Sequence, residues 1–167
     1  MLILSLIIAR NGGDDDSRDG TGFARRPDGR YNSLAMALKR EDFERMVEEA
    51  VLAIPAGMRE KVRNVEIVLE RRPTAEQDEC GDGIEGEAGD LLGLFEGLSI
   101  IEQGGDISGS LPGKITLFTQ AIVDEAGAEE EVARVVRETL WHEIAHYFGF
   151  DEDDAYRLEA KWARGLE

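Results

Sequence analysis

Two histidines and a glutamate form the one arrangement in this chain whose residue types and spacing are typical of metal chemistry. They occur as H-E-x-x-H, in which His142 and His146, the only histidines of the chain, are four residues apart and Glu143 follows the first. Four residues make about 1.1 turns of an α-helix, so both imidazoles project from one face and could bind one metal ion at ~2.1 Å. Glu143 lies about 100° further round the helix. This is the position of a general base that acts on metal-bound water without being a ligand itself.

A third ligand is required, because two histidines leave a zinc ion short of protein ligands. Gly149 can adopt a positive φ angle, which would end the helix and turn the chain back towards the metal. In the pattern H-E-x-x-H-x-x-G-x-x-Z the last position is Glu152, which ranks first as the third ligand. Asp151 is the close alternative, and Glu159 is a more distant one. The other carboxylates of this acidic run are expected to cap and solvate the last helix.

The motif lies within a long helical pattern, and the segments around it predict an α+β domain. Residue patterns predict helices at residues 41–54 (ended by Pro55), 129–148 and 153–166, and strands at residues 65–69, 91–98 and 114–119. Residues 71–90 and 102–113 are polar or rich in glycine and are expected to be loops or turns. This order differs from the regular alternation of a doubly wound sheet, so it favours the α+β class.

The long helix has two faces of different composition. The face expected to pack on the sheet comprises Ala133, Val136, Leu140, Ile144 and Tyr147. The face that carries the motif comprises Val135, Glu138, Thr139, His142 and His146. We therefore expect the metal face to be separate from the main core face. Glu138, one turn before His142, is the candidate partner for an imidazole N–H.

Composition and charge restrict the possible partners. The chain has 167 residues, with 19 Lys and Arg against 36 Asp and Glu, which gives a net charge of −17. A nucleic-acid partner would require clustered basic residues, and an anionic membrane surface would repel this chain. Neither is expected as a partner; the expected partner is a peptide or protein substrate, as the H-E-x-x-H motif indicates.

The N-terminal region differs in composition from the rest of the chain. Residues 1–39 are predicted to be a partly disordered extension, because residues 11–30 combine glycine, aspartate and arginine with almost no apolar side chains. The apolar run at residues 2–9 is far too short to span a bilayer and lacks the leading positive charge of a secretory signal. Residues 40–167 form the predicted domain. The single cysteine, Cys80, excludes an internal disulfide and favours a reduced, cytoplasmic location.

Four stretches of the chain, at residues 64–77, 91–97, 111–118 and 141–154, resemble the minimal zincin-like metallopeptidases of bacteria. The resemblance implies a compact α+β zincin fold, in which a small mixed sheet packs on the long motif-bearing helix. It also implies that His142 and His146 bind zinc and that Glu143 is the catalytic acid and base. The family pattern places an acidic residue, usually Asp, where this chain has Glu152. All four methionines precede the motif, so the Met-turn of the metzincins is absent.

These features together predict a zinc-dependent metallopeptidase that hydrolyses peptide bonds. An extended substrate could add to an exposed sheet edge at residues 91–97, although the same residues fit an ordinary core strand equally well. The alternative is a catalytically weak or inactive zincin scaffold with a binding or regulatory role. Activity on unfolded protein would distinguish the two functions.

Overall fold

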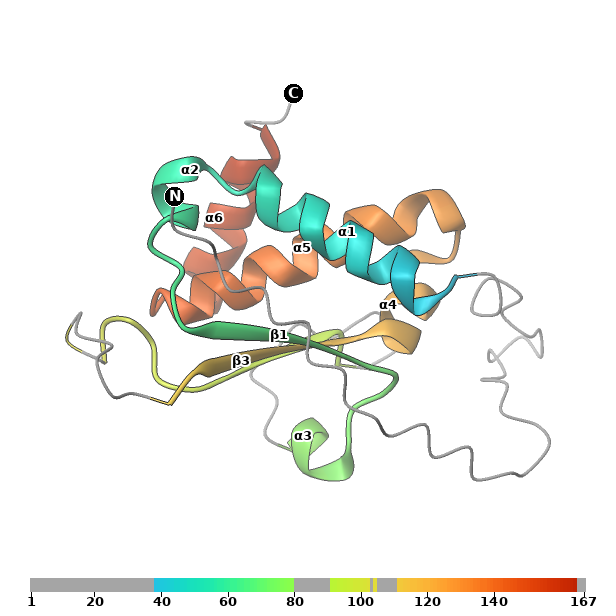
Figure 1. Cartoon of the computed structure of the whole chain (residues 1–167), viewed down its shortest axis with the longest axis horizontal. Helices are drawn as coiled ribbons and strands as arrows, with labels where there is room; N and C mark the ends of the chain where they lie inside the picture. The colour runs from blue at the N-terminus through green and yellow to red at the C-terminus, as the bar shows by residue number, and fades with distance from the viewer. Residues whose placement is uncertain (1–37, 80–90, 103, 105–110, 165–167) are drawn as a thin grey trace.

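The computed structural model of the chain describes residues 38–79, 91–102, 104 and 111–164 (Figure 1). The predicted N-terminal extension, apart from residues 38 and 39, and Cys80 lie outside the described residues. The elements in chain order are α1 (Arg40–Ala53), α2 (Ala56–Arg59), β1 (Val65–Glu70), α3 (Ala75–Glu79), β2 (Gly93–Glu96), β3 (Gly113–Phe118), α4 (Thr119–Ala126), α5 (Glu129–Tyr147) and α6 (Glu152–Arg164). The predicted α+β class is confirmed. No helix among the described residues is long and apolar enough to cross a membrane.

The elements with a strong residue pattern form where the sequence predicts them. The predicted helices correspond to α1, α5 and α6, and the predicted strands to β1, β2 and β3. The patterns do not predict α2 or α4, and the prediction of a loop throughout residues 71–90 is wrong at α3. A capping box starts α3, because Thr74 Oγ1 accepts from the N–H of Gln77 (3.3 Å) and Gln77 Oε1 accepts from the N–H of Thr74 (2.8 Å). By contrast, α4 follows β3 directly and has no side-chain cap.

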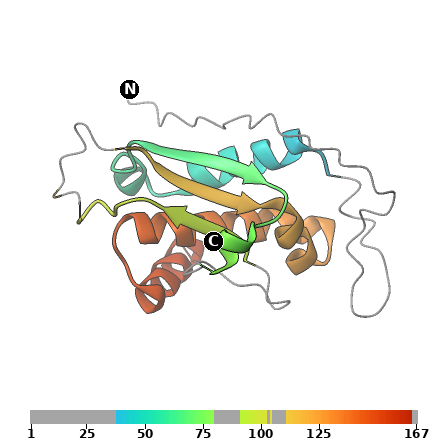
Figure 2. The same ribbon diagram turned by 90° about the horizontal axis from the view of Figure 1, so that it is seen from below.

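The three strands form one mixed sheet in the order β1-β3-β2. β1 runs parallel to β3, with Val65 opposite Gly113, and β2 runs antiparallel to β3, with Gly93 opposite Leu117. Figure 2 shows the strands in front of α1 and α5, with β3 in the middle. β1 and β2 are therefore the edge strands of the described sheet, and α5 packs against β2 and β3.

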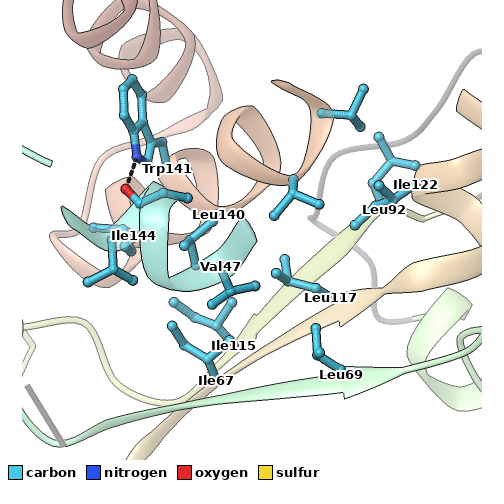
Figure 3. Close-up of a cluster of buried hydrophobic side chains, with 14 of the residues drawn as sticks. Val47, Ile67, Leu69, Leu92, Ile115, Leu117, Ile122, Leu140, Trp141 and Ile144 are labelled. Atoms are coloured by element: carbon cyan, nitrogen blue, oxygen red, sulfur yellow. Dashed lines mark hydrogen bonds between the residues drawn. The ribbon is translucent and has the colours of Figure 1, made fainter. Parts of the chain in front are cut away.

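The core lies between one face of the sheet and the helices α1 and α5 (Figure 1). Side chains from the sheet, such as Ile67 and Ile115, meet Val47 of α1 and Leu140 of α5 in this layer (Figure 3). Trp141 of α5 donates its indole N–H to the backbone oxygen of Ala50 in α1 at 2.9 Å (Figure 3). This bond satisfies the polar atom of a fully buried ring and joins the two helices.

The predicted division of α5 into a core face and a separate metal face is wrong. Four residues of the expected core face are buried, namely Val136, Leu140, Ile144 and Tyr147, but Ala133 is exposed. Three residues of the other face, Val135, Thr139 and His142, are also buried. The reason is that β2 and α6 pack against α5 as well, so the helix is covered on more than one side.

Candidate metal centre

The last turns of α5 place the three motif residues together at the core. His142 and Glu143 are fully buried, and the side chain of His146 retains 17% of its exposure. The two imidazole rings meet edge to face, with centroids 4.7 Å apart. The helical spacing therefore brings both rings to one side of α5, as the sequence predicts.

A tight turn after α5 directs the chain back over the histidines. Gly149 has φ = 84°, its N–H donates to the oxygen of His146 (2.8 Å), and the N–H of Phe150 donates to the oxygen of Ala145 (3.1 Å). This left-handed residue satisfies the last carbonyls of the helix and reverses the chain. The Phe150 carbonyl also lies 3.2 Å from His146 Nδ1. A carbonyl can only accept, so Nδ1 carries the proton and Nε2 is the atom of His146 that faces the cluster.

Glu152, the first residue of α6, completes the cluster. Its Oε2 lies 3.1 Å from His142 Nε2, and its Oε1 lies 3.2 Å from His146 Nε2. One donor atom from each of the three residues lies within 4.8 Å of the other two. Asp151, the alternative third ligand, instead accepts the N–H of Asp154 on Oδ1 (3.0 Å) and so caps α6. The turn thus brings together the three residues that rank first from the sequence.

The donor set and its spacing fit a zinc ion. Two imidazole nitrogens and one carboxylate form a combination that zinc accepts in three-ligand sites with an open fourth position. Tetrahedral ligands about 2.1 Å from an ion lie roughly 3.4 Å from one another. The observed separations of 3.1 and 3.2 Å between Glu152 and the two imidazoles are close to this value.

Glu159 approaches the second nitrogen of the His142 ring, whereas Glu138 pairs with another residue. Glu159 Oε2 is 3.8 Å from His142 Nδ1. Glu138, the partner expected from the sequence, forms an ion pair with Arg134 on its own helix. The interpretation of Glu138 as the imidazole partner is therefore wrong. Glu138 is also one turn from Arg134 on the same helix, and it pairs with this arginine instead. Glu159, the third-ranked ligand, approaches the non-coordinating nitrogen instead.

One face of α6 surrounds His142. Glu152, Tyr156 and Glu159 have the spacing i, i+4, i+7, which places them on one side of a helix. Glu152 reaches Nε2, Glu159 approaches Nδ1, and the Tyr156 ring contacts the imidazole edge to face with centroids 4.7 Å apart. This spacing is visible in the sequence, and it is the signal that would have identified Tyr156 and Glu159 as neighbours of the site.

The carboxylates of the site control the protonation of His142. Burial is the largest single effect and lowers the pKa of His142, but the nearby carboxylate of Glu159 and the charges of Glu143 and Glu152 raise it more. The net result is a pKa above the usual value of 6.5. A proton and a metal ion would therefore compete for the same ring.

Comparison with known families agrees with the geometry of the cluster. A family model described as zincin-like metallopeptidase matches residues 62–162, which extend from just before β1 into α6 and include the whole cluster. A search of curated proteins finds no match.

Proposed function

We propose that this chain, which belongs to the zincin-like metallopeptidase family, is a zinc-dependent peptidase in which Glu143 is the general base. The observation that carries the proposal is the convergence of His142, His146 and Glu152 beside the buried Glu143. Three protein ligands leave one position open, which is the arrangement of catalytic zinc sites.

In this proposal His142, His146 and Glu152 hold the metal ion. Zinc bound there would lower the pKa of a coordinated water towards ~7 and polarise the scissile carbonyl. Glu143 would accept the proton of the attacking water and later deliver it to the nitrogen of the leaving amine. Its position on α5, one residue after the ligand His142, keeps its carboxylate beside the cluster without making it a ligand.

The edge strand β2 supports a peptide as the substrate. The N–H of Phe118 donates to the oxygen of Leu92 (3.0 Å), which makes this antiparallel pair a hydrogen-bonded one. Hydrogen-bonded and non-hydrogen-bonded pairs alternate, so the backbone groups of Gly93 and Phe95 point away from β3. An extended peptide could pair with these groups as an added strand. A peptide paired at Gly93 would lie close to Glu143, since Gly93 packs against the Glu143 side chain.

Metal analysis and hydrolysis of the full chain test the proposal. We expect about one zinc per chain by elemental analysis and loss of that zinc in His146→Ala. We expect Glu143→Gln to keep the zinc and to hydrolyse a denatured protein at least ~10²-fold more slowly than wild type, the effect of removing a general base. Absence of bound zinc after zinc is supplied would refute the metal site. Bound zinc without any hydrolysis by wild type would favour the alternative, a zincin scaffold with a binding role.

The cellular location and the domain boundary are proposals that rest on the sequence alone. We propose a cytoplasmic location because Cys80 has no second cysteine with which to form a disulfide. We also propose residues 40–167 as the catalytic domain and residues 1–39 as an extension to it. Removal of residues 1–39 should leave zinc content and hydrolysis unchanged, and loss of either would refute this boundary.

A further inference from the structure

Gly93 in β2 packs against the proposed base. A Cβ atom added to Gly93 would lie 2.6 Å from Thr139 Cγ2, 3.1 Å from Glu143 Cγ and 3.2 Å from Glu143 Oε1. Gly93 does not have a positive φ angle, so its backbone conformation is open to any residue. Contact with α5 is therefore the reason that this position excludes a side chain.

The strand cannot move away to make room for a side chain at Gly93. Gly93 lies opposite Leu117 of the central strand, and the preceding residue, Leu92, is bonded to β3 through its carbonyl. Leu92 and Leu94 on either side are buried in the core. Retreat of β2 would break these contacts, so a new atom at position 93 would displace Thr139 and Glu143 instead.

We propose that Gly93 is a positioning residue for Glu143: the absent side chain lets the backbone of β2 lie against the Glu143 carboxylate and hold it beside the metal-ligand cluster. This inference rests on the proposed function, because it assigns to Glu143 the role of the base. It gives β2 a second role besides pairing with substrate, since Gly93 borders both the edge of the described sheet and the base.

Two contacts with different consequences make the inference testable. The contact at 2.6 Å involves a methyl group of Thr139, and the contacts at 3.1 and 3.2 Å involve Glu143. Thr139→Ser removes the methyl group and leaves the contacts with Glu143 in place. In Gly93→Ala combined with Thr139→Ser, the chain should fold with a stability close to that of Thr139→Ser alone, while Glu143 is still displaced by a few tenths of an ångström.

The expected catalytic effect is a selective loss of kcat. A misplacement of about 1 Å can cost ~10²-fold in rate, so a few tenths of an ångström should cost about three- to tenfold. We expect this loss in kcat for the double variant relative to Thr139→Ser, with KM changed less than kcat and zinc content unchanged. Gly57→Ala is the matched control, since a Cβ added to Gly57 in α2 meets no atom within 4 Å.

A second measurement does not depend on hydrolysis. Cobalt(II) supplied to the metal-free chain should give a visible absorption spectrum that responds to the groups around the ion, and Glu143→Gln provides the reference for a changed base. We expect the spectrum of the double variant to shift from that of wild type towards that of Glu143→Gln, and the spectra of Thr139→Ser and Gly57→Ala to match wild type.

The outcomes separate the inference from the proposed function. A double variant whose kcat and cobalt spectrum both match Thr139→Ser would show that Gly93 serves packing alone and would overturn the inference. A wild-type chain that binds cobalt but hydrolyses nothing would overturn the proposed function, while the spectra still decide whether Gly93 positions Glu143. A chain that binds no cobalt would overturn both.

Discussion

Glu159→Gln should lower the affinity of the chain for zinc about tenfold, and Glu138→Gln should leave it unchanged. The two substitutions remove the same charge from two glutamates near the site. Glu159 approaches His142 Nδ1, whereas Glu138 pairs with Arg134. A carboxylate at Nδ1 orients the ring and increases the basicity of the nitrogen that binds the metal.

The magnitude follows from the distance and the exposure. Unit charges 3.8 Å apart, the separation of Glu159 Oε2 and His142 Nδ1, would interact by about 1 kcal/mol in water and about 4 kcal/mol at an effective dielectric constant of ~20. The imidazole that binds zinc is neutral, and the Glu159 side chain is 19% exposed, so these values are upper limits for the effect on zinc binding. Removal of such a partner costs 10- to 100-fold in metal affinity. Because 3.8 Å exceeds a hydrogen-bond length, we expect the lower end, about 1.4 kcal/mol or tenfold.

Competition for zinc with a chromogenic chelator would measure both variants. The loss in Glu159→Gln should be greatest at a pH above the pKa of His142. It should shrink as the pH falls, because Glu159 also raises that pKa and its removal weakens the competing proton. Thermal unfolding of both metal-free variants controls for a general loss of structure. Equal affinities of Glu159→Gln and wild type, or a greater loss in Glu138→Gln, would refute the assignment of Glu159 as the partner of His142.

Three further results are expected. The pKa of His142 is raised in the folded chain, so protonation of this ring stabilises the metal-free protein. The stabilisation is complete at a pH below the unfolded pKa of about 6.5, and it is lost as the pH rises through the folded pKa. The melting temperature in excess chelator should fall over that range, and a flat profile would contradict the raised pKa. Gly149→Ala should lower the free energy of unfolding by about 1–2 kcal/mol, because φ is 84° and a Cβ would lie 2.8 Å from Ile101 Cδ1. The same substitution should weaken zinc binding, and an unchanged zinc affinity would show that the turn does not orient Glu152. Leu140→Ala, at a fully buried core position, should cost about 2–5 kcal/mol in urea unfolding, and a loss below 1 kcal/mol would contradict the packing described here.

Local spacing was sufficient to predict the elements that carry the chemistry. The apolar periodicity of α5 and the four-residue separation of His142 and His146 both follow from the geometry of a single helix. The end of α1 before Pro55, and the turn at Gly149 that precedes Glu152, follow from the backbone preferences of proline and glycine. These features depend on residues a few positions apart, so they can be read without knowing what packs against them.

The surroundings of the site were decided by the tertiary structure. Thr139 and His142 are buried because β2 and α6 cover the face of α5 that the sequence alone presents as separate from the core. Glu159 approaches Nδ1 of His142, and not the nitrogen that faces the cluster, because of the way in which α6 packs against α5. The contact of Gly93 with Glu143 joins residues fifty positions apart and depends on the pairing of β2 with β3. A sequence specifies which residues share a face of one element, but the choice of partner for that face is a property of the whole packed chain.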